Sequence, residues 1–173
     1  MGLSQSGIKP SYISLIRIPR AVLLKTLAFL RVQGNNLKEG MVFWSGRLIG
    51  RDEARITRCI IPEQIATPAG VRVLLDSAFK ISVGLSDRKE FLFVQVHSHP
   101  GSSFHSTIDD YNPITDKPGF FSIVVPNYGK VKPYDFFSWC INEYEGVGRW
   151  RELSLEEVRQ RFVIEDDHHG SRI

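Results

Sequence analysis

Residues 91–110, FLFVQVHSHPGSSFHSTIDD, join the most hydrophobic run of the chain to histidines, hydroxyl groups and carboxylates. Residues 91–96 are apolar at nearly every position and mostly β-branched or aromatic, which predicts a strand that is buried on both faces. His97 and His99 follow at the carboxyl end of this strand. Because side chains two residues apart on a strand point the same way, both imidazoles can bind one metal ion, at the Zn–N distance of about 2.0–2.1 Å.

The residues after the histidines predict a change from strand to helix. A proline and a glycine end the strand, and Ser106-x-x-Asp109 is typical of a helix start with Ser106 as the N-cap. Alone, this motif indicates a helix cap, and His-x-His alone indicates a pair of hydrogen-bonded strand histidines. Together, behind a buried strand, they predict a zinc site with His97, His99 and Asp109 as ligands and a water in the fourth position.

The sequence His97-Ser98-His99-Pro100, followed by Ser106-x-x-Asp109, resembles the signature of the JAMM (MPN+, JAB domain) zinc metalloproteases. These are deubiquitinase-like enzymes that cut after ubiquitin or ubiquitin-like proteins. The resemblance extends over roughly residues 12–139 and implies an upstream catalytic glutamate. The best match is Glu39, which follows an apolar helical segment, starts a predicted strand and has Gly46 seven residues later, as the family usually does.

The position of the third metal ligand leaves two registers open. The family usually has seven residues between the second histidine and the serine, whereas six separate His99 from Ser106. The motif shifted by one residue, Thr107-x-x-Asp110, restores the usual count. Ser106 and Asp109 are preferred because the literal serine stands there, and because a loop of glycine and serine easily absorbs a shortening by one residue.

The predicted metal site also requires a general base. Zinc held by two imidazoles and a carboxylate lowers the pKa of a bound water to about 7, and a nearby carboxylate must take its proton and pass it to the leaving amine. Glu39 is expected to do so, although Val42 replaces the family's middle glycine and Gly40 follows the glutamate directly. Ser106 is expected to donate a hydrogen bond to the oxyanion, an interaction typically worth about 3–4 kcal/mol. Three rival carboxylates are expected to be solvated: Glu53, Glu63 and Glu90.

The remaining histidines and the cysteines are expected to have no chemical role. His105 is expected to be an exposed loop residue, with contact to a metal ligand as the alternative. His168 and His169 lie in a polar C-terminal tail and are assigned no function. Cys59 and Cys140 are far apart and flanked by apolar residues, which predicts buried free thiols in a reducing compartment.

The composition indicates a single globular domain. The chain has 173 residues, 42% of them hydrophobic and 24% charged, so we expect one JAB/MPN metalloprotease domain over residues 1–173 with a polar tail at about 166–173. No apolar run reaches membrane-spanning length and no signal peptide is present, which predicts a cytoplasmic protein with no membrane partner. The net charge of +3 is mild, and no basic stripe with interleaved aromatics indicates nucleic acid. Four arginines near a predicted hairpin are expected to form a solvated face, with a docking patch as the alternative: Arg47, Arg51, Arg55 and Arg58.

The periodicity of apolar residues predicts alternating strands and helices. Strands are expected at residues 12–18, 40–48, 54–61, 91–96, 120–125, 134–144 and 161–164, helices at 20–32, 71–85 and after a capping box at 154–157, and a loop at 62–70. The fold class is therefore α/β. It agrees with the fold that the resemblance implies, an MPN (JAB)-like, mixed, mainly antiparallel curved sheet flanked by helices, with cytidine-deaminase-like architecture.

The resemblance also implies partners. The substrate is expected to be a ubiquitin-like protein or its conjugate, whose C-terminal tail binds as an added strand. The short segment between Asp110 and Phe120 indicates a minimal prokaryotic type, and such members occur beside activating and conjugating enzymes, in some cases in antiviral operons. Three alternatives remain: a non-catalytic MPN scaffold, a protease of sulfur-carrier proteins, and a metal-dependent phosphoesterase or amidohydrolase, which usually calls for more than the five histidines present.

Overall fold

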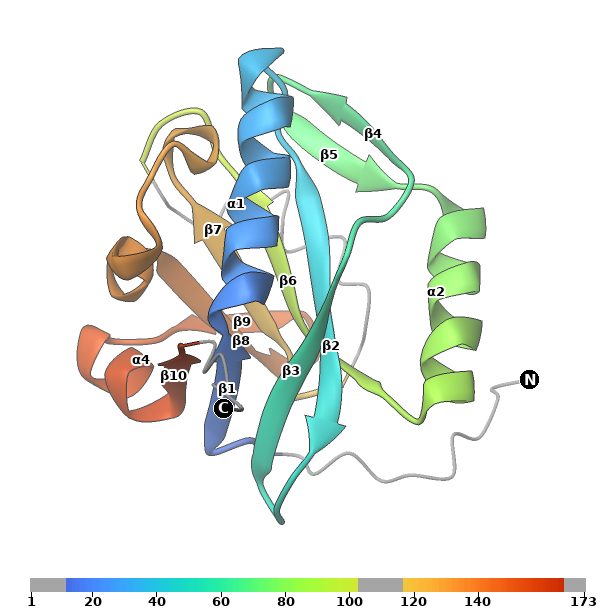
Figure 1. The fold of residues 1–173 in the computed structure, drawn as a ribbon, viewed down its shortest axis with the longest axis vertical. Coiled ribbons are helices and arrows are strands. Elements are labelled where there is room, and N and C mark those ends of the chain that lie inside the picture. The colour runs from blue at the N-terminus through green and yellow to red at the C-terminus, as the bar shows by residue number, and fades with distance from the viewer. Residues whose placement is uncertain (1–11, 103–116, 167–173) are drawn as a thin grey trace, which may run out of the picture.

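The fold is built around one curved, eight-stranded mixed sheet (Figure 1), in a computed structural model that describes residues 12–102 and 117–166. The strand order is β10-β1-β3-β2-β6-β7-β8-β9. The strands are β1 (Leu15–Pro19), β2 (Met41–Leu48), β3 (Glu53–Ile60), β6 (Phe91–Ser98), β7 (Phe121–Val125), β8 (Cys140–Gly146), β9 (Arg149–Glu152) and β10 (Phe162–Glu165). The pairs β1·β10, β1·β3 and β6·β7 are parallel and the other neighbours are antiparallel, which confirms the predicted mixed, mainly antiparallel sheet.

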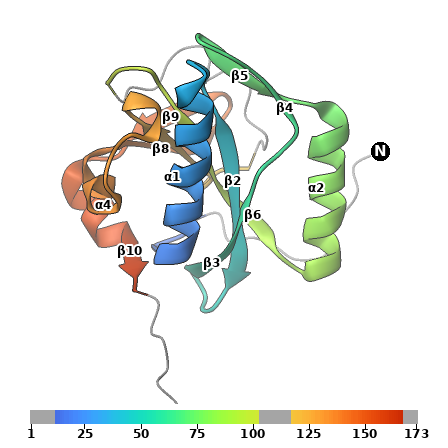
Figure 2. The ribbon, with the colours of Figure 1, turned by 45° about the horizontal axis from the view of Figure 1, so that its top comes forward.

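Two principal helices flank the sheet, as predicted. Helix α1 (Arg20–Asn35) packs on it through Leu23, Leu27 and Leu30, which are fully buried. Helix α2 (Leu75–Arg88) lies on the other side of β2 and β3, and Figures 1 and 2 show these two strands between the helices. Within residues 12–102 and 117–166, no helix is both long and apolar enough to cross a bilayer.

The capping box predicted near the C-terminus starts helix α4 (Leu155–Arg161). The Ser154 hydroxyl accepts a hydrogen bond from the Glu157 N–H at 3.2 Å, and the Glu157 carboxylate accepts one from the Ser154 N–H at 2.8 Å. Together with a hydrogen bond from Arg151, this backbone contact lowers the pKa of Glu157 to about 2. The short helix is therefore fixed by local interactions that the sequence predicts.

The centre of the sheet is the hydrophobic core. The predicted strand at residues 91–96 is confirmed as β6, which continues to Ser98 and is buried from Phe93 onward. Trp44 on the neighbouring strand β2 is fully buried, and its indole N–H donates to the Thr26 hydroxyl of α1 at 2.8 Å. Burying each large apolar side chain of this kind contributes about 1.5–3 kcal/mol. This packing makes the carboxyl end of β6 a rigid platform.

The prediction of a loop at residues 62–70 is wrong. Residues Gln64–Thr67 form strand β4, which pairs with β5 (Gly70–Val73) in a hairpin of its own. The hairpin closes through a two-residue turn, since Thr67 pairs with Gly70. The polar residues and the proline in this segment give no apolar alternation that would predict a strand. Residues 64–67 form a strand because they pair with β5.

The helix predicted at residues 71–85 is displaced along the chain. It begins at Leu75 and ends at Arg88, because Val71 and Val73 are taken up by the β4·β5 ladder. Two large apolar residues of this helix, Leu75 and Phe79, are 87% and 66% exposed. The stripe that faces the sheet is therefore narrower than the sequence indicates.

The strand predicted at residues 134–144 is correct only in its second half. Residues Pro133–Ser138 form a 3-10 helix, and β8 begins at Cys140. Pro133 suits the first turn of a helix because it has no N–H to leave unpaired. Phe136 on this turn is fully buried and stacks on Trp44, with 6.5 Å between ring centroids. Strand β9, which completes a hairpin with β8, was not predicted.

A bulge in the central strands explains Gly46. Ser45 pairs with Arg58 and Gly46 pairs with Ile56, so Thr57 of β3 is an extra residue at this point. A Cβ atom on Gly46 would lie 2.0 Å from the Arg55 carbonyl oxygen, closer than any side chain can approach. Glycine is therefore required where β2 passes the bulge.

Replacing Gly46 with alanine is expected to destabilise the fold by at least about 1–3 kcal/mol, because the added methyl group forces the two strands apart. Urea unfolding at several protein concentrations measures the loss. Gly50→Ala is the matched control, because a Cβ there would meet Glu53 at an ordinary contact distance of 3.5 Å. Equal unfolding midpoints for the two variants would show that the bulge tolerates a side chain.

Candidate metal centre

The two predicted histidine ligands lie at the carboxyl end of β6, and the backbone holds them on both sides. His97 pairs with Met41 of β2 and with Val124 of β7. His99 continues toward β7, where its N–H donates to the Val125 carbonyl oxygen at 3.0 Å and its own carbonyl accepts from the Tyr128 N–H at 2.8 Å. Both residues are buried, with 1% and 4% of their surface exposed.

The spacing of the imidazoles fits a shared metal ion. The ring centroids of His97 and His99 are 5.1 Å apart, with the planes inclined by 56°. Two imidazoles that bind a tetrahedral ion through nitrogen at about 2.0–2.1 Å place their centroids about 5 Å apart. The pair is therefore placed as two ligands of one divalent ion would be.

The glutamate predicted as the general base directly precedes a backbone contact between the start of β2 and the end of β6. The Gly40 carbonyl oxygen accepts from the Ser98 N–H at 3.0 Å, and the Gly40 N–H donates to the Ser98 hydroxyl at 3.1 Å. Met41 pairs with His97, and continuing this register two residues past the end of the ladder would set Glu39 opposite His99. Opposite residues of an antiparallel pair share a face, with Cβ atoms about 4.5–5.5 Å apart. Glu39 is 7% exposed, and the continued register predicts that it shares one face of the sheet with both histidines.

Gly40 explains one departure from the family pattern. A Cβ atom at this position would lie 3.0 Å from Gln33 and 3.2 Å from both Leu30 and Phe29 of α1. Residue 40 therefore faces helix α1, and neighbouring side chains on a strand point to opposite faces. This packing turns Glu39 away from α1 and toward the histidine face.

The hairpin that the sequence did not predict holds the glutamate segment from the other side. Strand β3 has already ended at Ile60, and the Gln64 side chain takes its place beside β2. Its Oε1 accepts from the Met41 N–H and its Nε2 donates to the Met41 carbonyl, both at 2.8 Å. The Glu39 N–H donates to the Thr67 carbonyl oxygen at 2.9 Å. Sequence reasoning missed Gln64 and Thr67, because residues 62–70 carry no pattern that distinguishes them from a loop.

The other predicted site residues lie outside the described residues. These are Ser106 and Asp109, the alternative pair Thr107 and Asp110, and the histidines without an assigned role, His105, His168 and His169. Among residues 12–102 and 117–166, no group of three or more His, Cys, Asp and Glu side chains is arranged to hold a metal ion. The described residues thus include the two predicted histidine ligands and the glutamate, and the metal site itself stays a prediction.

The rival carboxylates lie elsewhere, and one of them is not solvated. Glu53 forms an ion pair with Arg17, and Glu63 is exposed and lies 3.4 Å from the Lys80 ammonium. Glu90 was predicted to be a surface residue, which is wrong: it is 8% exposed. Its carboxylate accepts hydrogen bonds from Ser45 and Thr57 instead of water. It directly precedes β6, at the end of the strand opposite His97, roughly 23 Å away at the usual rise per residue.

The predicted free thiols are confirmed. Cys59 and Cys140 are both buried and neither forms a disulfide. Burial raises the pKa of the Cys59 thiol, which lies 3.5 Å from the Thr26 hydroxyl. The thiol is therefore protonated at neutral pH and packs as part of the core.

Comparison with known proteins identifies relatives. No protein-family model matches the chain. It is 32% identical over 154 residues to the probable metalloprotease y4jG of Sinorhizobium fredii, covering 86% of this chain and 93% of the relative. The solution structure of protein DSY2949 from Desulfitobacterium hafniense matches with a TM-score of 0.62 at 14% identity, over 90% of this chain and 97% of that one.

A second solved structure, the JAB1/MPN domain protein AF2198 from Archaeoglobus fulgidus, matches at 20% identity with a TM-score of 0.45, over 87% of this chain and 99% of that one. The relative from Sinorhizobium fredii, similar over most of both chains, shows the family that the histidine signature predicts. This chain belongs to the JAB/MPN metalloprotease family.

Proposed function

We propose that the chain is a zinc-dependent peptidase or isopeptidase of JAMM type that cleaves after the C-terminus of a ubiquitin-like protein. The observation that carries the proposal is the pair of buried imidazoles of His97 and His99 at the end of β6, with 5.1 Å between ring centroids, and the buried Glu39 two residues before the partner of His97. A catalytic zinc site needs such a pair of imidazole ligands, whereas a non-catalytic scaffold does not. A probable metalloprotease among the relatives supports the same activity.

Each of the named side chains has a proposed role. His97, His99 and Asp109 hold the zinc, and Thr107 and Asp110 are the alternative to Ser106 and Asp109. A bound zinc ion acidifies water and polarises the scissile carbonyl. The Glu39 carboxylate accepts the proton of the attacking water and then donates it to the leaving amine. The Ser106 hydroxyl donates a hydrogen bond to the carbonyl oxygen of the substrate as negative charge develops there.

The substrate is proposed to be the extended C-terminal tail of a ubiquitin-like protein, cleaved from a precursor peptide or from a conjugate. An extended tail binds as an added strand, through backbone hydrogen bonds at a sheet edge. We place the reaction in the cytoplasm, in a bacterial conjugation or antiviral system with activating and conjugating enzymes. A protease of sulfur-carrier proteins would use the same residues and differ only in the partner.

The experiment that tests this function supplies zinc and candidate substrates together. Zinc-loaded protein is incubated with ubiquitin-like and sulfur-carrier proteins, each extended past its C-terminus or joined to a lysine side chain, and the products are identified by mass spectrometry. We expect cleavage directly after the C-terminal residue, and none after treatment with a chelator. A protein that binds zinc and cleaves none of these substrates would support the scaffold instead.

A further inference from the structure

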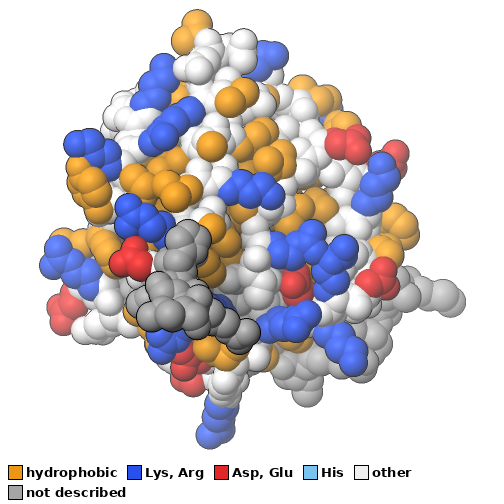
Figure 3. Space-filling model, viewed as in Figure 1, with side chains coloured by type: hydrophobic (Ala, Val, Ile, Leu, Met, Phe, Trp, Pro, Cys, Tyr) orange, Lys and Arg blue, Asp and Glu red, His pale blue; other side chains and the backbone are white. Residues whose placement is uncertain are grey.

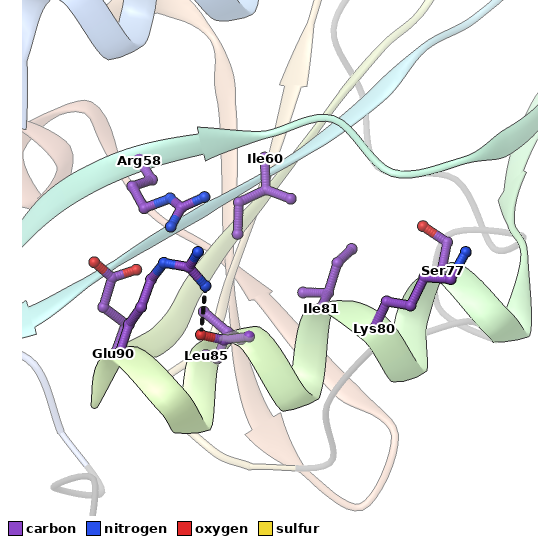
Figure 4. Close-up of a pocket in the computed structure, with 9 residues that line it drawn as sticks. Arg58, Ile60, Ser77, Lys80, Ile81, Leu85 and Glu90 are labelled. Carbon is purple, nitrogen blue, oxygen red and sulfur yellow. Dashed lines mark hydrogen bonds between the residues drawn. The ribbon is translucent and has the colours of Figure 1, made fainter.

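A second site lies at the other end of β6 from the histidines, between β3 and α2. It is a cavity of about 190 Å³, shown in Figure 4. Arg58, Lys80 and Arg88 line it with positive charge, and Ile60, Ile81 and Leu85 form its apolar wall. In Figure 4, Arg58 and Ile60 point from β3 toward the helix.

A buried carboxylate closes one end of the cavity. Glu90, which is 8% exposed, lines it. One carboxylate oxygen accepts from the Ser45 hydroxyl and the other from the Thr57 hydroxyl, each at 2.9 Å. In the described part of the chain, the Glu90 carboxylate accepts from these two hydroxyl groups and forms no hydrogen bond or ion pair with Arg58 or Arg88.

Irregular strands bring these side chains together. Thr57 is the extra residue of β3 at Ser45, and Phe93 is the extra residue of β6, because Trp44 pairs with Val94 and Ser45 with Leu92. A bulge redirects the side chains around it, so Thr57 and its neighbour Arg58 both serve the face that α2 covers. Both bulges lie next to Ser45 of the central strand β2. Bulges are common beside functional sites.

The balance of charge in the cavity favours an anion. Three cations and one carboxylate line it. Within the described part of the chain, the Arg58 side chain forms no hydrogen bond or ion pair. The Arg88 side chain donates from one nitrogen to the Gly84 carbonyl at 2.9 Å, the bond dashed in Figure 4. Among the described residues, Lys80 pairs only with the exposed Glu63, at 3.4 Å. Figure 3 shows Lys and Arg side chains gathered over β3 and toward α2 on this face.

We propose that this cavity binds a carboxylate or phosphate group, held by the guanidinium groups of Arg58 and Arg88. Guanidinium groups bind these anions through paired N–H donors. A cavity of about 190 Å³ is smaller than the roughly 300–1,000 Å³ of most ligand pockets, so it admits a group the size of one side chain and not a nucleotide. The site stands apart from the metal centre, because Ser45 lies four residues along β2 from Met41, roughly 13 Å.

The test is a titration followed by ¹⁵N NMR at low ionic strength, with two probes: inorganic phosphate and N-acetylglutamate amide, which carries one side-chain carboxylate. We expect saturable shifts of the Arg58 side-chain resonance and of the α2 amides. Arg58→Gln is expected to weaken binding at least tenfold, and Arg88→Gln likewise. Arg51→Gln removes the same charge from the exposed β2–β3 turn and is expected to change affinity less than twofold.

The two probes distinguish the source of the anion. Tighter binding of phosphate indicates a phosphorylated ligand, and tighter binding of the glutamate derivative indicates an acidic side chain of a protein partner. The unfolding midpoints of all variants show whether each protein is folded. The proposal fails if neither probe saturates, if the folded Arg58→Gln and Arg88→Gln proteins bind as the parent does, or if Arg51→Gln weakens binding as much as they do.

Discussion

Glu39→Gln is expected to lower kcat by about 10²–10⁴-fold while the protein keeps its metal ion. Glutamine has nearly the shape of glutamate and preserves the buried packing, but it cannot accept the proton of the attacking water. The backbone contacts that hold this residue, from the Glu39 N–H to Thr67 and from Gly40 to Ser98, do not involve the carboxylate. The variant therefore separates chemistry from folding, and steady-state kinetics with metal analysis measures both.

Glu63→Gln is the matched control for this substitution. Glu63 was a rival for the base, but it is exposed and pairs with Lys80 at the surface, so its variant is expected to retain the parental kcat. Both proteins should bind equal amounts of zinc. A Glu39→Gln enzyme that turns over substrate at the parental rate would assign the base to another residue, whatever the outcome with Glu63.

Replacing His99 with alanine is expected to abolish metal binding and, with it, all hydrolysis. A catalytic zinc site usually has three protein ligands, and loss of one removes the tetrahedral arrangement. Zinc content is expected to fall from about one ion per chain to less than about a tenth, because the remaining donors do not enclose the ion. Metal analysis after dialysis, together with activity at saturating zinc, measures the effect.

Thermal unfolding gives a second measure of the same loss. Zinc binding to the native state is expected to raise the melting temperature of the parent. At a free zinc concentration 100 times the dissociation constant, zinc adds about 2.7 kcal/mol to the free energy of unfolding. His99→Ala should show no such rise. His168→Ala, in the polar tail, removes the same imidazole from a position without an assigned role and should behave as the parent. A zinc-dependent rise in His99→Ala equal to that of the parent would place the ion elsewhere.

Local patterns predicted the parts of this fold whose structure depends on near neighbours. Residues 91–96 are apolar except for Gln95, and such a short run of aromatic and β-branched residues favours a buried strand. His97 and His99, two residues apart at its end, are therefore expected to share one face. The capping box at Ser154 was equally secure, since it is made within one turn of helix. The same reasoning cannot distinguish β4 from a loop, because that strand exists only through its pairing with β5.

The sequence by itself determined the paired histidines, the strand that carries them and the family they indicate. Tertiary structure decided which carboxylates are buried, and where. The segment of Glu39 is held next to the end of β6 because Gly40 bonds to Ser98, 58 residues away, while Glu90 accepts hydrogen bonds from hydroxyl groups of two other strands. The periodicity of a segment indicates which of its side chains face the core. Which strands become neighbours depends on pairing between distant segments, and that pairing brings together the residues of the predicted metal centre and those of the basic cavity.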